Sequence, residues 1–564
     1  MYHKKLFLSF SFLLYSLNLF SATYYVSSTS GNDGNLGTSS TSPWQTINKV
    51  NTEALLPGDS VLFKRGETWR GQLIPQSGSN VSEIFYGAYS SGDKPMILGS
   101  INKSNTSDWV DQGANIWEST QVFFTDVGNI IFDNELSVGF KKWNLVDLLI
   151  QDDYWYDLVS GRVSVFSTSN PALSHTVIEL ALREHIVNQE NKSDITFDNL
   201  SIKYGAAHGF GGGNTANIAI TSCDISYIGG GDLNMDGLIR FGNGVEFWGN
   251  ASNNSVEKCR IWEIYDTGVT NQNHTNTAVQ ENIRYRNNLI WNCGLASFEY
   301  WNRPVTSTTS NIYFENNTCL FAGSGWGVQR PDYHGIHAVI DANPAQTDTI
   351  FIRNNIFYNA QRSIYAVEDN INGFIDLDYN LINQNLATDT LFASFPSFTL
   401  FTFASFTAYT SATGKDVNSI TGVPEFVDLS GLNFQLTNLS PCIDAGTAVN
   451  LTDDFNADLR PFYGGFDIGA YEYSGPLSVA ENSIEKVRIF PNPAKESIFI
   501  SEIESFGSNA SLLIVDAQGK IIREASHFKF SEKIDTSQLT EGIYLLVIES
   551  ETGEKAIGKM QILR

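Results

Sequence analysis

The middle of the chain repeats a short pattern, and this repeat constrains the fold more than any other feature. Each unit is a run of β-type residues that ends in Asn-Asn or an equivalent pair, followed by apolar residues. Marking each unit by the second Asn or its replacement gives Asn199, Cys223, Cys259, Asn288, Asn317, Asn355 and Asn380. The steps between marks are 24, 36, 29, 29, 38 and 25 residues. Such a period, with occasional insertions, is typical of a solenoid of stacked β-coils.

Stacking explains why such a unit can be stable. One coil cannot bury the apolar face of its short strands by itself, so it packs on the next coil. We expect Asn at the mark because it tolerates the left-handed backbone conformation of a turn. Stacked Asn side chains can also form a hydrogen-bonded ladder, in which Cys223 and Cys259 replace Asn. Residues 46–56 carry a helical pattern, and we expect them to cover the open N-terminal end of the solenoid.

Charge excludes two classes of partner. Lys and Arg total 35 and Asp and Glu total 61, which gives a net charge of −26. Nucleic acids and anionic membrane surfaces are bound through clustered Lys and Arg, so neither is expected as a partner.

The N-terminus has the pattern of a signal peptide. Lys4 and Lys5 precede an uncharged apolar run over residues 6–20, and Ser21-Ala22 offers a small-residue cleavage site. The run is too short for a comfortable membrane span. We expect residues 1–22 to be removed, no transmembrane segment, and a monomeric secreted chain.

The cysteines do not form a disulfide framework. The five residues are Cys223, Cys259, Cys293, Cys319 and Cys442, and their spacing does not suggest a zinc site. Most of them lie in the repeats, so we expect small apolar core residues rather than disulfides.

A resemblance to a known superfamily follows from motifs near the N-terminus. They are Tyr24-Tyr-Val-Ser, Gly31-Asn-Asp-Gly, Pro43-Trp-Gln-Thr-Ile, Pro57-Gly-Asp-Ser-Val-Leu-Phe and Gly66-Glu-Thr-Trp-Arg-Gly. With the repeats, they resemble the right-handed parallel β-helix proteins of the pectin-lyase-like superfamily over about residues 23–430. The resemblance implies a secreted carbohydrate-active enzyme. We expect a cap and first coils over residues 23–190 and coils carrying the site over 191–430.

The end of the chain resembles two further segments. Residues 431–473, with Ser440-Pro-Cys-Ile-Asp-Ala-Gly, resemble the closing segment of bacterial surface β-helix proteins. After a linker at 474–485, residues 486–564 resemble the type IX secretion sorting domain of Bacteroidota, with Val487-Arg-Ile-Phe-Pro-Asn-Pro-Ala and Leu539-Thr-Glu-Gly-Ile-Tyr. This resemblance implies the type IX machinery as a partner and a secreted or cell-surface location. Short alternating strands independently predict a small β-sandwich, so the whole chain is expected to be all-β.

Two strand-like segments carry a glutamate in the same setting. They are Gly244-Val-Glu246-Phe-Trp248 and Ser297-Phe-Glu299-Tyr-Trp301. Alternation along a strand predicts that both glutamates face the same way, two coils and roughly 9.5 Å apart. Inverting glycosidases separate their carboxyl groups by about 6.5–9.5 Å. Asp266 lies one coil from each glutamate, and a pair of solvated surface glutamates is the alternative.

The long steps mark insertions at residues 229–237 and 330–348. In the first, Asp232-x-Asn234-x-Asp236-Gly237 has the spacing of the first half of a calcium loop. The bidentate Glu of such a loop is missing, because Asn243 stands in its place. The alternatives are a Ca²⁺ site at Asp232, Asn234 and Asp236, or an Asx-rich turn without metal.

Cations and aromatic residues gather near the second insertion. We expect Arg330, His334 and His337 to take part in catalysis, and a further set to bind substrate: His208, Trp248, Tyr300, Trp301, Arg303 and Tyr333. β-Elimination from a uronic acid needs a cation that neutralises the carboxylate and a base that removes the α-proton. Known lyases of the superfamily often use Lys or Arg with Ca²⁺, but no Lys stands out in these coils.

Three functions remain open at this point. The first is a lyase that cleaves a uronic-acid-containing polysaccharide or oligosaccharide, which the cations favour. The second is an inverting glycoside hydrolase that uses Glu246 and Glu299, and the third is a non-catalytic carbohydrate-binding β-helix.

Overall fold

The computed structural model describes residues 21–237, 239–331, 334–342, 347–475, 485–501, 506, 510–517, 520–530, 532–550 and 555–564. The predicted signal peptide, except residues 21 and 22, lies outside these residues, and so does most of the predicted linker.

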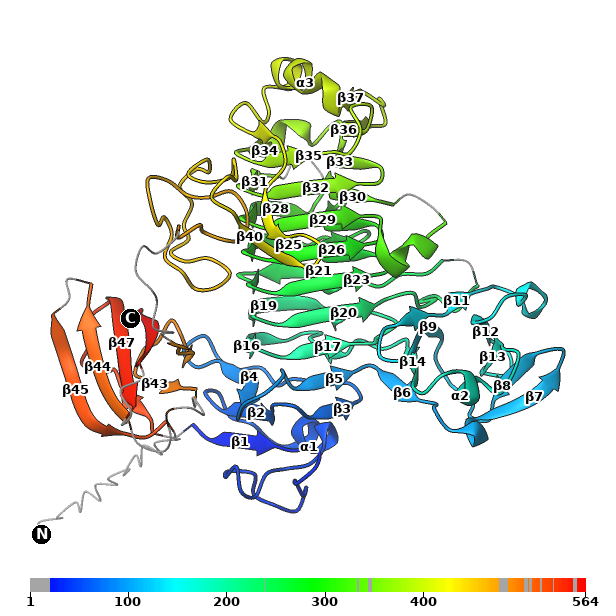
Figure 1. The fold of residues 1–564 in the computed structure, drawn as a ribbon, viewed down its shortest axis with the longest axis horizontal. Coiled ribbons are helices and arrows are strands. Elements are labelled where there is room, and N and C mark those ends of the chain that lie inside the picture. Colours follow the sequence, from blue (N-terminus) through cyan, green and yellow to red (C-terminus); the bar gives the residue numbers. More distant parts are fainter. Residues whose placement is uncertain are drawn as a thin grey trace, which may run out of the picture.

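In the part of the chain that the structure describes, three stacks of parallel strands form the body (Figure 1). The first sheet contains β15 (Val187–Asn188), β18 (Phe210–Gly211), β21 (Val245–Ser252), β24 (Thr267–Asn273), β27 (Ala296–Asn302), β30 (Ile336–Ala342), β33 (Ser363–Glu368) and β36 (Thr390–Phe395), and β37 (Leu400–Thr402) ends it in antiparallel pairing. The second contains β1 (Thr23–Val26), β2 (Ser60–Lys64), β4 (Ile84–Tyr89), β16 (Ser193–Asp198), β19 (Gly213–Thr221), β22 (Ser255–Glu257), β25 (Val279–Arg286), β28 (Thr308–Glu315), β31 (Ile350–Arg353) and β34 (Ile375–Asp378). The third contains β3 (Thr68–Arg70), β5 (Met96–Leu98), β17 (Ser201–Lys203), β20 (Asp224–Ile228), β23 (Arg260–Ile264), β26 (Leu289–Cys293), β29 (Thr318–Ala322), β32 (Ile356–Ala360), β35 (Leu381–Asn383) and β38 (Ile420–Thr421).

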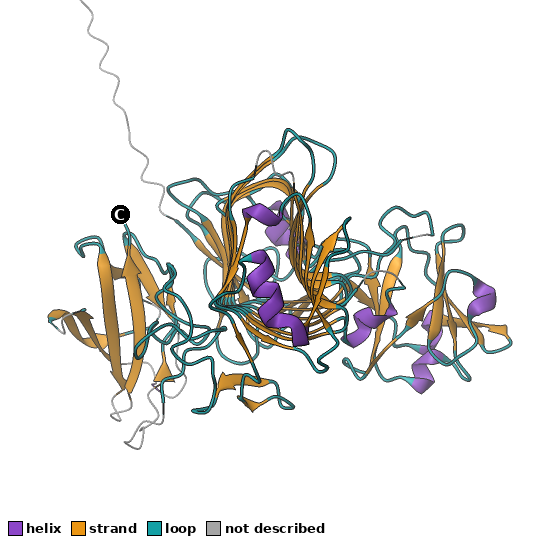
Figure 2. Ribbon diagram, turned by 90° about the horizontal axis from the view of Figure 1, so that it is seen from above, coloured by secondary structure: helices purple, strands orange, loops and turns teal. Residues whose placement is uncertain are grey.

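The three sheets enclose one continuous apolar core. Figure 2 looks along the stack, where strands of successive coils lie behind one another. Inward-facing residues of neighbouring coils are in register, as Val245, Val269 and Phe298 show in the first sheet. The predicted β-solenoid is therefore confirmed as a body of stacked parallel sheets.

The predicted Asn ladder is present inside the coils. Asn288 donates to Asn317 Oδ1 over 2.9 Å, and Asn317 donates to Asn355 Oδ1 over 3.0 Å. Asn355 in turn donates to Asn380 Oδ1 over 3.1 Å. At the other end, Asn288 Oδ1 accepts the backbone N–H of Cys259 over 2.9 Å.

Two details of the repeat prediction were wrong. The residue in the left-handed conformation is the one before the ladder residue, as Asn287 and Asn316 show with φ values of 53° and 54°. In each Asn-Asn pair, the first Asn thus adopts the turn conformation and the second stacks its side chain in the ladder. The residue chosen to mark the first repeat, Asn199, was also one position too early. Ser201 pairs with Asp224, so Leu200 rather than Asn199 stacks on Cys223.

Helices lie at both ends of the body. Helix α1 (Ile47–Thr52) buries Ile47 and Val50 in the coil core, as predicted for residues 46–56. Helix α3 (Phe406–Thr413) buries Tyr409 at the opposite end. The remaining described short helices are α2 (Pro171–Ser174), η1 (Thr106–Asp108), η2 (Leu145–Asp147), η3 (Gly325–Gln329), η5 (Asn372–Phe374) and η6 (Phe403–Ser405).

An insertion that the sequence did not predict interrupts the early coils. We call residues 100–182 the insertion; it projects sideways from the body at the right of Figure 1 and has an apolar core of its own. Its strands are β6 (Ser100–Asn102), β7 (Trp109–Gly113), β8 (Ile116–Ser119), β9 (Val127–Phe132), β10 (Ser137–Val138), β11 (Phe140–Lys141), β12 (Asp153–Asp157), β13 (Arg162–Phe166) and β14 (Ile178–Leu182).

The C-terminal part contains a closing segment and a separate small β domain. The hairpin of β39 (Phe426–Asp428) and β40 (Asn433–Leu436) leads into the closing segment, whose Phe434 packs on Trp291 of the third sheet. The small domain has its own core and contains β41 (Glu485–Lys486), β42 (Ile489–Phe490), β43 (Ser497–Ile500), β44 (Ala510–Asp516), β45 (Ile521–Phe528), β46 (Ile534–Asp535), β47 (Gly542–Ser550) and β48 (Lys555–Ile562).

Two further predictions can be compared with the structure. All five cysteines are buried and free of disulfides, which confirms their predicted role in the core. Among the described residues, no helix is both long and apolar enough to span a bilayer.

Candidate active site

The two predicted glutamates lie in register on the outer face of the first sheet. Glu246 pairs with Thr270 of the next strand, and Thr270 pairs with Glu299 of the strand after it. Their neighbours Phe247 and Phe298 point into the core, so alternation places both glutamates on the outer face. Two strand spacings correspond to roughly 9.5 Å between their backbone positions. The predicted register is confirmed.

Glu246 is held by side chains from two adjacent coils. Asn243 Nδ2 donates to Oε2 over 2.7 Å, and Asn243 Oδ1 is fixed by the backbone N–H of Thr267 over 3.0 Å. His208 Nδ1 accepts the backbone N–H of Asn243 over 2.9 Å, so in the neutral ring the proton is on Nε2, which lies 3.4 Å from Oε1. Burial lowers the pKa of His208 to about 4, so its imidazole is neutral near pH 7.

The surroundings of Glu246 favour its protonated form. The residue is 6% exposed, and this burial raises its pKa to about 7, against the opposing effects of His185 and Asn243. His185 stacks on His208 with ring centroids 5.0 Å apart. The His185 ring fits there because residue 211 is Gly: a Cβ at that position would lie 2.5 Å from its Nδ1.

Glu299 is still more strongly shifted. Its side chain is 1% exposed, and burial raises its pKa well above the usual range. The negative charges of Asp266 and Glu246 raise it further, whereas a hydrogen bond from Gln272 and the positive charge of Arg330 oppose the shift. Gln272 Nε2 donates to Oε2 over 2.6 Å. Glu299 is therefore suited to carry a proton at neutral pH.

Asp266 and Arg330 form an ion pair beside Glu299. Arg330 Nη1 lies 2.6 Å from Asp266 Oδ1, and both side chains are buried. Arg330 follows η3, whose Trp326 packs on Tyr265 at 5.1 Å between ring centroids. The insertion at residues 330–348 thus brings a cation to the candidate site, and that cation is paired with the carboxylate of Asp266.

A row of aromatic rings runs along the same outer face. His274 lies between Trp248 and Trp301, with ring centroids 5.2 Å and 4.9 Å away. Arg303 covers the Trp301 ring at 3.9 Å and forms an ion pair with Asp341 over 2.6 Å. Trp248 is 38% exposed. Flat rings of this kind suit the apolar faces of sugars.

Some predicted site residues do not face this surface. The Tyr300 ring is in the coil core, and its hydroxyl donates to Thr309 over 2.8 Å. His337 also points inward, with Nδ1 2.9 Å from Ser297 Oγ and its ring against Phe357. These positions do not favour the predicted binding and catalytic roles. His334 is partly buried in the turn before β30, and Tyr333 lies outside the described residues.

The predicted calcium loop is a turn closed by its own backbone. Asp232 Oδ1 accepts the N–H of Asp236 over 3.3 Å, and Oδ2 accepts that of Gly237 over 2.6 Å. Within the described ranges, no group of three or more His, Cys, Asp or Glu side chains is arranged to hold a metal. The arrangement is that of the Asx-rich alternative, and calcium at Asp232, Asn234 and Asp236 stays a prediction.

Four residues of the site were missed as functional candidates. They are Asn243, Gln272, His274 and His185, and each contacts a predicted residue. Gln272 could have been found, because it lies two residues after Thr270 and must share its outer face. His185 could not, because the coil that contains it follows the unpredicted insertion.

Comparisons with known proteins identify the end of the chain. Residues 488–562 match the family described as the secretion system C-terminal sorting domain. This match confirms the predicted sorting domain and its location: the chain is directed to secretion or the cell surface.

The body is similar to part of a curated enzyme. Over 195 residues it is 35% identical to the lacto-N-biosidase of Bifidobacterium longum subsp. longum. The aligned part covers 32% of this chain and 12% of that enzyme, so the chain spans only a small share of this relative.

Similar solved structures have low sequence identity. A complex of XylC with xylose gives a TM-score of 0.44 at 13% identity and covers 66% of this chain and 68% of that one. The GH136 lacto-N-biosidase from Eubacterium ramulus, as its selenomethionine derivative, gives a TM-score of 0.31 at 14% identity. The match covers 67% of this chain and 66% of that one.

Proposed function

We propose that the chain is an exported glycoside hydrolase in which Glu299 is the general acid and Glu246 the general base. One observation carries the proposal: two buried carboxyl groups with raised pKa values lie in register on one outer face, two strands apart. The partial similarity to a lacto-N-biosidase supports the same class of reaction.

The two carboxyl groups divide the reaction between them. Glu299 gives its proton to the glycosidic oxygen as the bond to the anomeric carbon breaks. Glu246 takes a proton from a water molecule, whose oxygen bonds to the anomeric carbon from the opposite face. The spacing of roughly two strands leaves room for that water, so the product has inverted configuration.

Asn243 and Gln272 orient these groups. Each donates one amide hydrogen bond to a carboxylate oxygen, Asn243 to Glu246 Oε2 and Gln272 to Glu299 Oε2. Trp248 is the exposed ring of this row and would hold a sugar unit next to the cleaved bond through its free face, while His274 packs against it.

The charges around the site favour hydrolysis over elimination. An eliminating enzyme needs a cation for the substrate carboxylate. Here Arg330 is paired with Asp266 and Arg303 with Asp341, so both guanidinium groups already neutralise carboxylates of the protein. A uronic acid would have to share these two guanidinium groups with Asp266 and Asp341.

The test uses the full chain and a panel of oligosaccharides that includes aryl lacto-N-biosides and uronic-acid chains. We expect new reducing ends, no rise in absorbance near 235 nm, and inverted anomers by NMR. Glu299→Gln should lower turnover about 10²- to 10⁴-fold. A rise at 235 nm would establish elimination instead, and binding without any new ends would establish a carbohydrate-binding protein.

Calcium at the Asp232 turn is a separate proposal. A bound ion would stabilise the folded chain by about 2.7 kcal/mol at a hundredfold excess over its Kd. The melting temperature should then rise with Ca²⁺ and fall with chelator, and Asp236→Asn should weaken the effect. An unchanged melting temperature would contradict it.

A further inference from the structure

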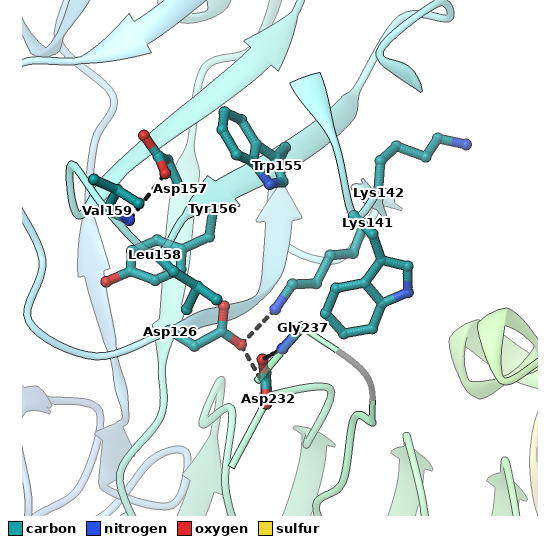
Figure 3. Close-up of a pocket in the computed structure, with 11 residues that line it drawn as sticks. Asp126, Lys141, Lys142, Trp155, Tyr156, Asp157, Leu158, Val159, Asp232 and Gly237 are labelled. Carbon is teal, nitrogen blue, oxygen red and sulfur yellow. Dashed lines mark hydrogen bonds and ion pairs between the residues drawn. The ribbon is translucent and has the colours of Figure 1, made fainter. Parts of the chain in front are cut away.

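A cavity lies between the insertion at residues 100–182 and the turn that contains Asp232. Its volume is about 230 Å³, and its lining comes from these two segments. Figure 3 shows Trp155, Tyr156 and Asp157 of β12 on one side and Asp232 with Gly237 on the other. The chain continues from this turn to Asn243 and Glu246, so the cavity is joined by one short segment to the candidate active site.

The cavity combines aromatic surface with fixed polar groups. Trp143 and Trp155 line it and are partly exposed, so both rings can contact a ligand. Asp126 forms a buried ion pair with Lys141 and accepts the backbone N–H of Asp232 over 2.6 Å. These contacts hold the polar end of the cavity in one arrangement before any ligand arrives.

Charge decides which ligands fit. Lys141 is paired with Asp126, and Lys142 lies 3.1 Å from Asp153. The lining also contains Asp157 and Asp232. The carboxylates in the lining outnumber the lysines, so an anionic ligand is disfavoured. A ligand with hydroxyl groups is favoured, because hydroxyl groups can donate hydrogen bonds to the carboxylates. The volume is below the roughly 300–1,000 Å³ of sites for drug-sized ligands, so one ring fits better than a chain.

We propose that this cavity binds a single neutral sugar ring, stacked on Trp155 and hydrogen-bonded to the carboxylates beside it. The choice of a saccharide rests on the proposed function, but the binding itself needs no catalysis. The ring would belong to a branch or a distant unit of the carbohydrate that the enzyme acts on.

The test is a ligand-observed NMR titration of the full chain with Glu299→Gln, which slows any turnover during the titration. The probes are the methyl glycosides of glucose, galactose, xylose and N-acetylglucosamine. We expect saturable binding of at least one probe, weakened about tenfold by Trp155→Ala. Trp155→Phe keeps a ring and should lose less than about threefold. Phe140→Ala removes an exposed ring of the insertion outside the cavity and is the matched control.

The outcomes separate this inference from the catalytic proposal. Loss of binding with Trp155→Ala but not with Phe140→Ala supports the cavity, whether or not the unmodified chain hydrolyses any substrate. Binding that is lost with Trp248→Ala and retained with Trp155→Ala would overturn it, because the sugar would then occupy only the first sheet. Absence of binding for all four probes would also overturn it.

Discussion

Replacing Gln272 by Met tests the assignment of the general acid through its pKa. The amide of Gln272 donates to Glu299 Oε2 over 2.6 Å and stabilises the ionised carboxylate. Met has a similar length but no N–H group, so Gln272→Met removes this hydrogen bond with little change in packing. The ionised form of Glu299 loses more than the protonated form, and its pKa should rise.

The size of the shift follows from the difference between two kinds of hydrogen bond. A bond to a charged group contributes about 1.5–3 kcal/mol, and one between neutral groups about 0.5–1.5 kcal/mol. The difference is about 1–1.5 kcal/mol, and 1.36 kcal/mol corresponds to one pKa unit. Gln272→Met should therefore raise the pKa of Glu299 by about one unit.

The assay is the pH dependence of kcat/KM on an aryl glycoside, once the test of the proposed function has found one that the chain hydrolyses. A general acid must be protonated, so activity falls as pH rises through the pKa of Glu299. This fall is the alkaline limb of the pH profile, and in Gln272→Met it should move about one unit towards higher pH. Gln361→Met makes the same chemical change at an exposed turn residue and should leave the limb in place. An alkaline limb that stays or moves to lower pH in Gln272→Met would refute Glu299 as the acid.

Three further predictions concern the same scaffold. Glu246 must be ionised to act as base, so kcat/KM should fall as pH drops below about 7, and a flat acid limb would contradict this role. Asp266→Asn removes a negative charge next to Glu299 and should move the alkaline limb to lower pH, opposite to Gln272→Met. Asn317→Ala removes four side-chain hydrogen bonds inside the coils and should lower the free energy of unfolding in urea by about 4 kcal/mol. Asn250→Ala at an exposed position should cost less than about 1 kcal/mol, and equal losses would refute the ladder's role.

The fold of the body could be predicted from the sequence because the same residue pattern recurs from coil to coil. The marked coils each carry an apolar run, and all but the first have Asn or Cys at the ladder position, so one misplaced mark, Asn199, did not affect the stack. The glutamates were predictable for the same reason. Glu246 and Glu299 occupy equivalent positions in two similar segments. Because the coils stack, equivalent positions lie in register along the sheet.

The parts that could not be predicted lack such repetition. The insertion at residues 100–182 has ordinary antiparallel strands that interrupt the period, and only its own core identifies it. Tyr300 is a different case, because strand alternation next to Glu299 already places it on the inner face. His337 lies at the corner of a coil, where alternation breaks: Ile336 and Val339 face outward, but His337 and Ala338 face inward.

In the proposed mechanism, the different roles of the two glutamates come from differences between the coils that carry them. A perfectly repeated coil would give both glutamates the same surroundings and similar pKa values, and neither would be distinguished as acid or base. Glu246 has neutral partners in His208 and Asn243, whereas Glu299 lies near the negative charge of Asp266. Asn243 and Arg330 both come from the long steps of the repeat. The regular coils therefore set the spacing of the carboxyl groups, and burial together with the different neighbours of each glutamate sets their proton affinities, which general acid–base hydrolysis requires to differ.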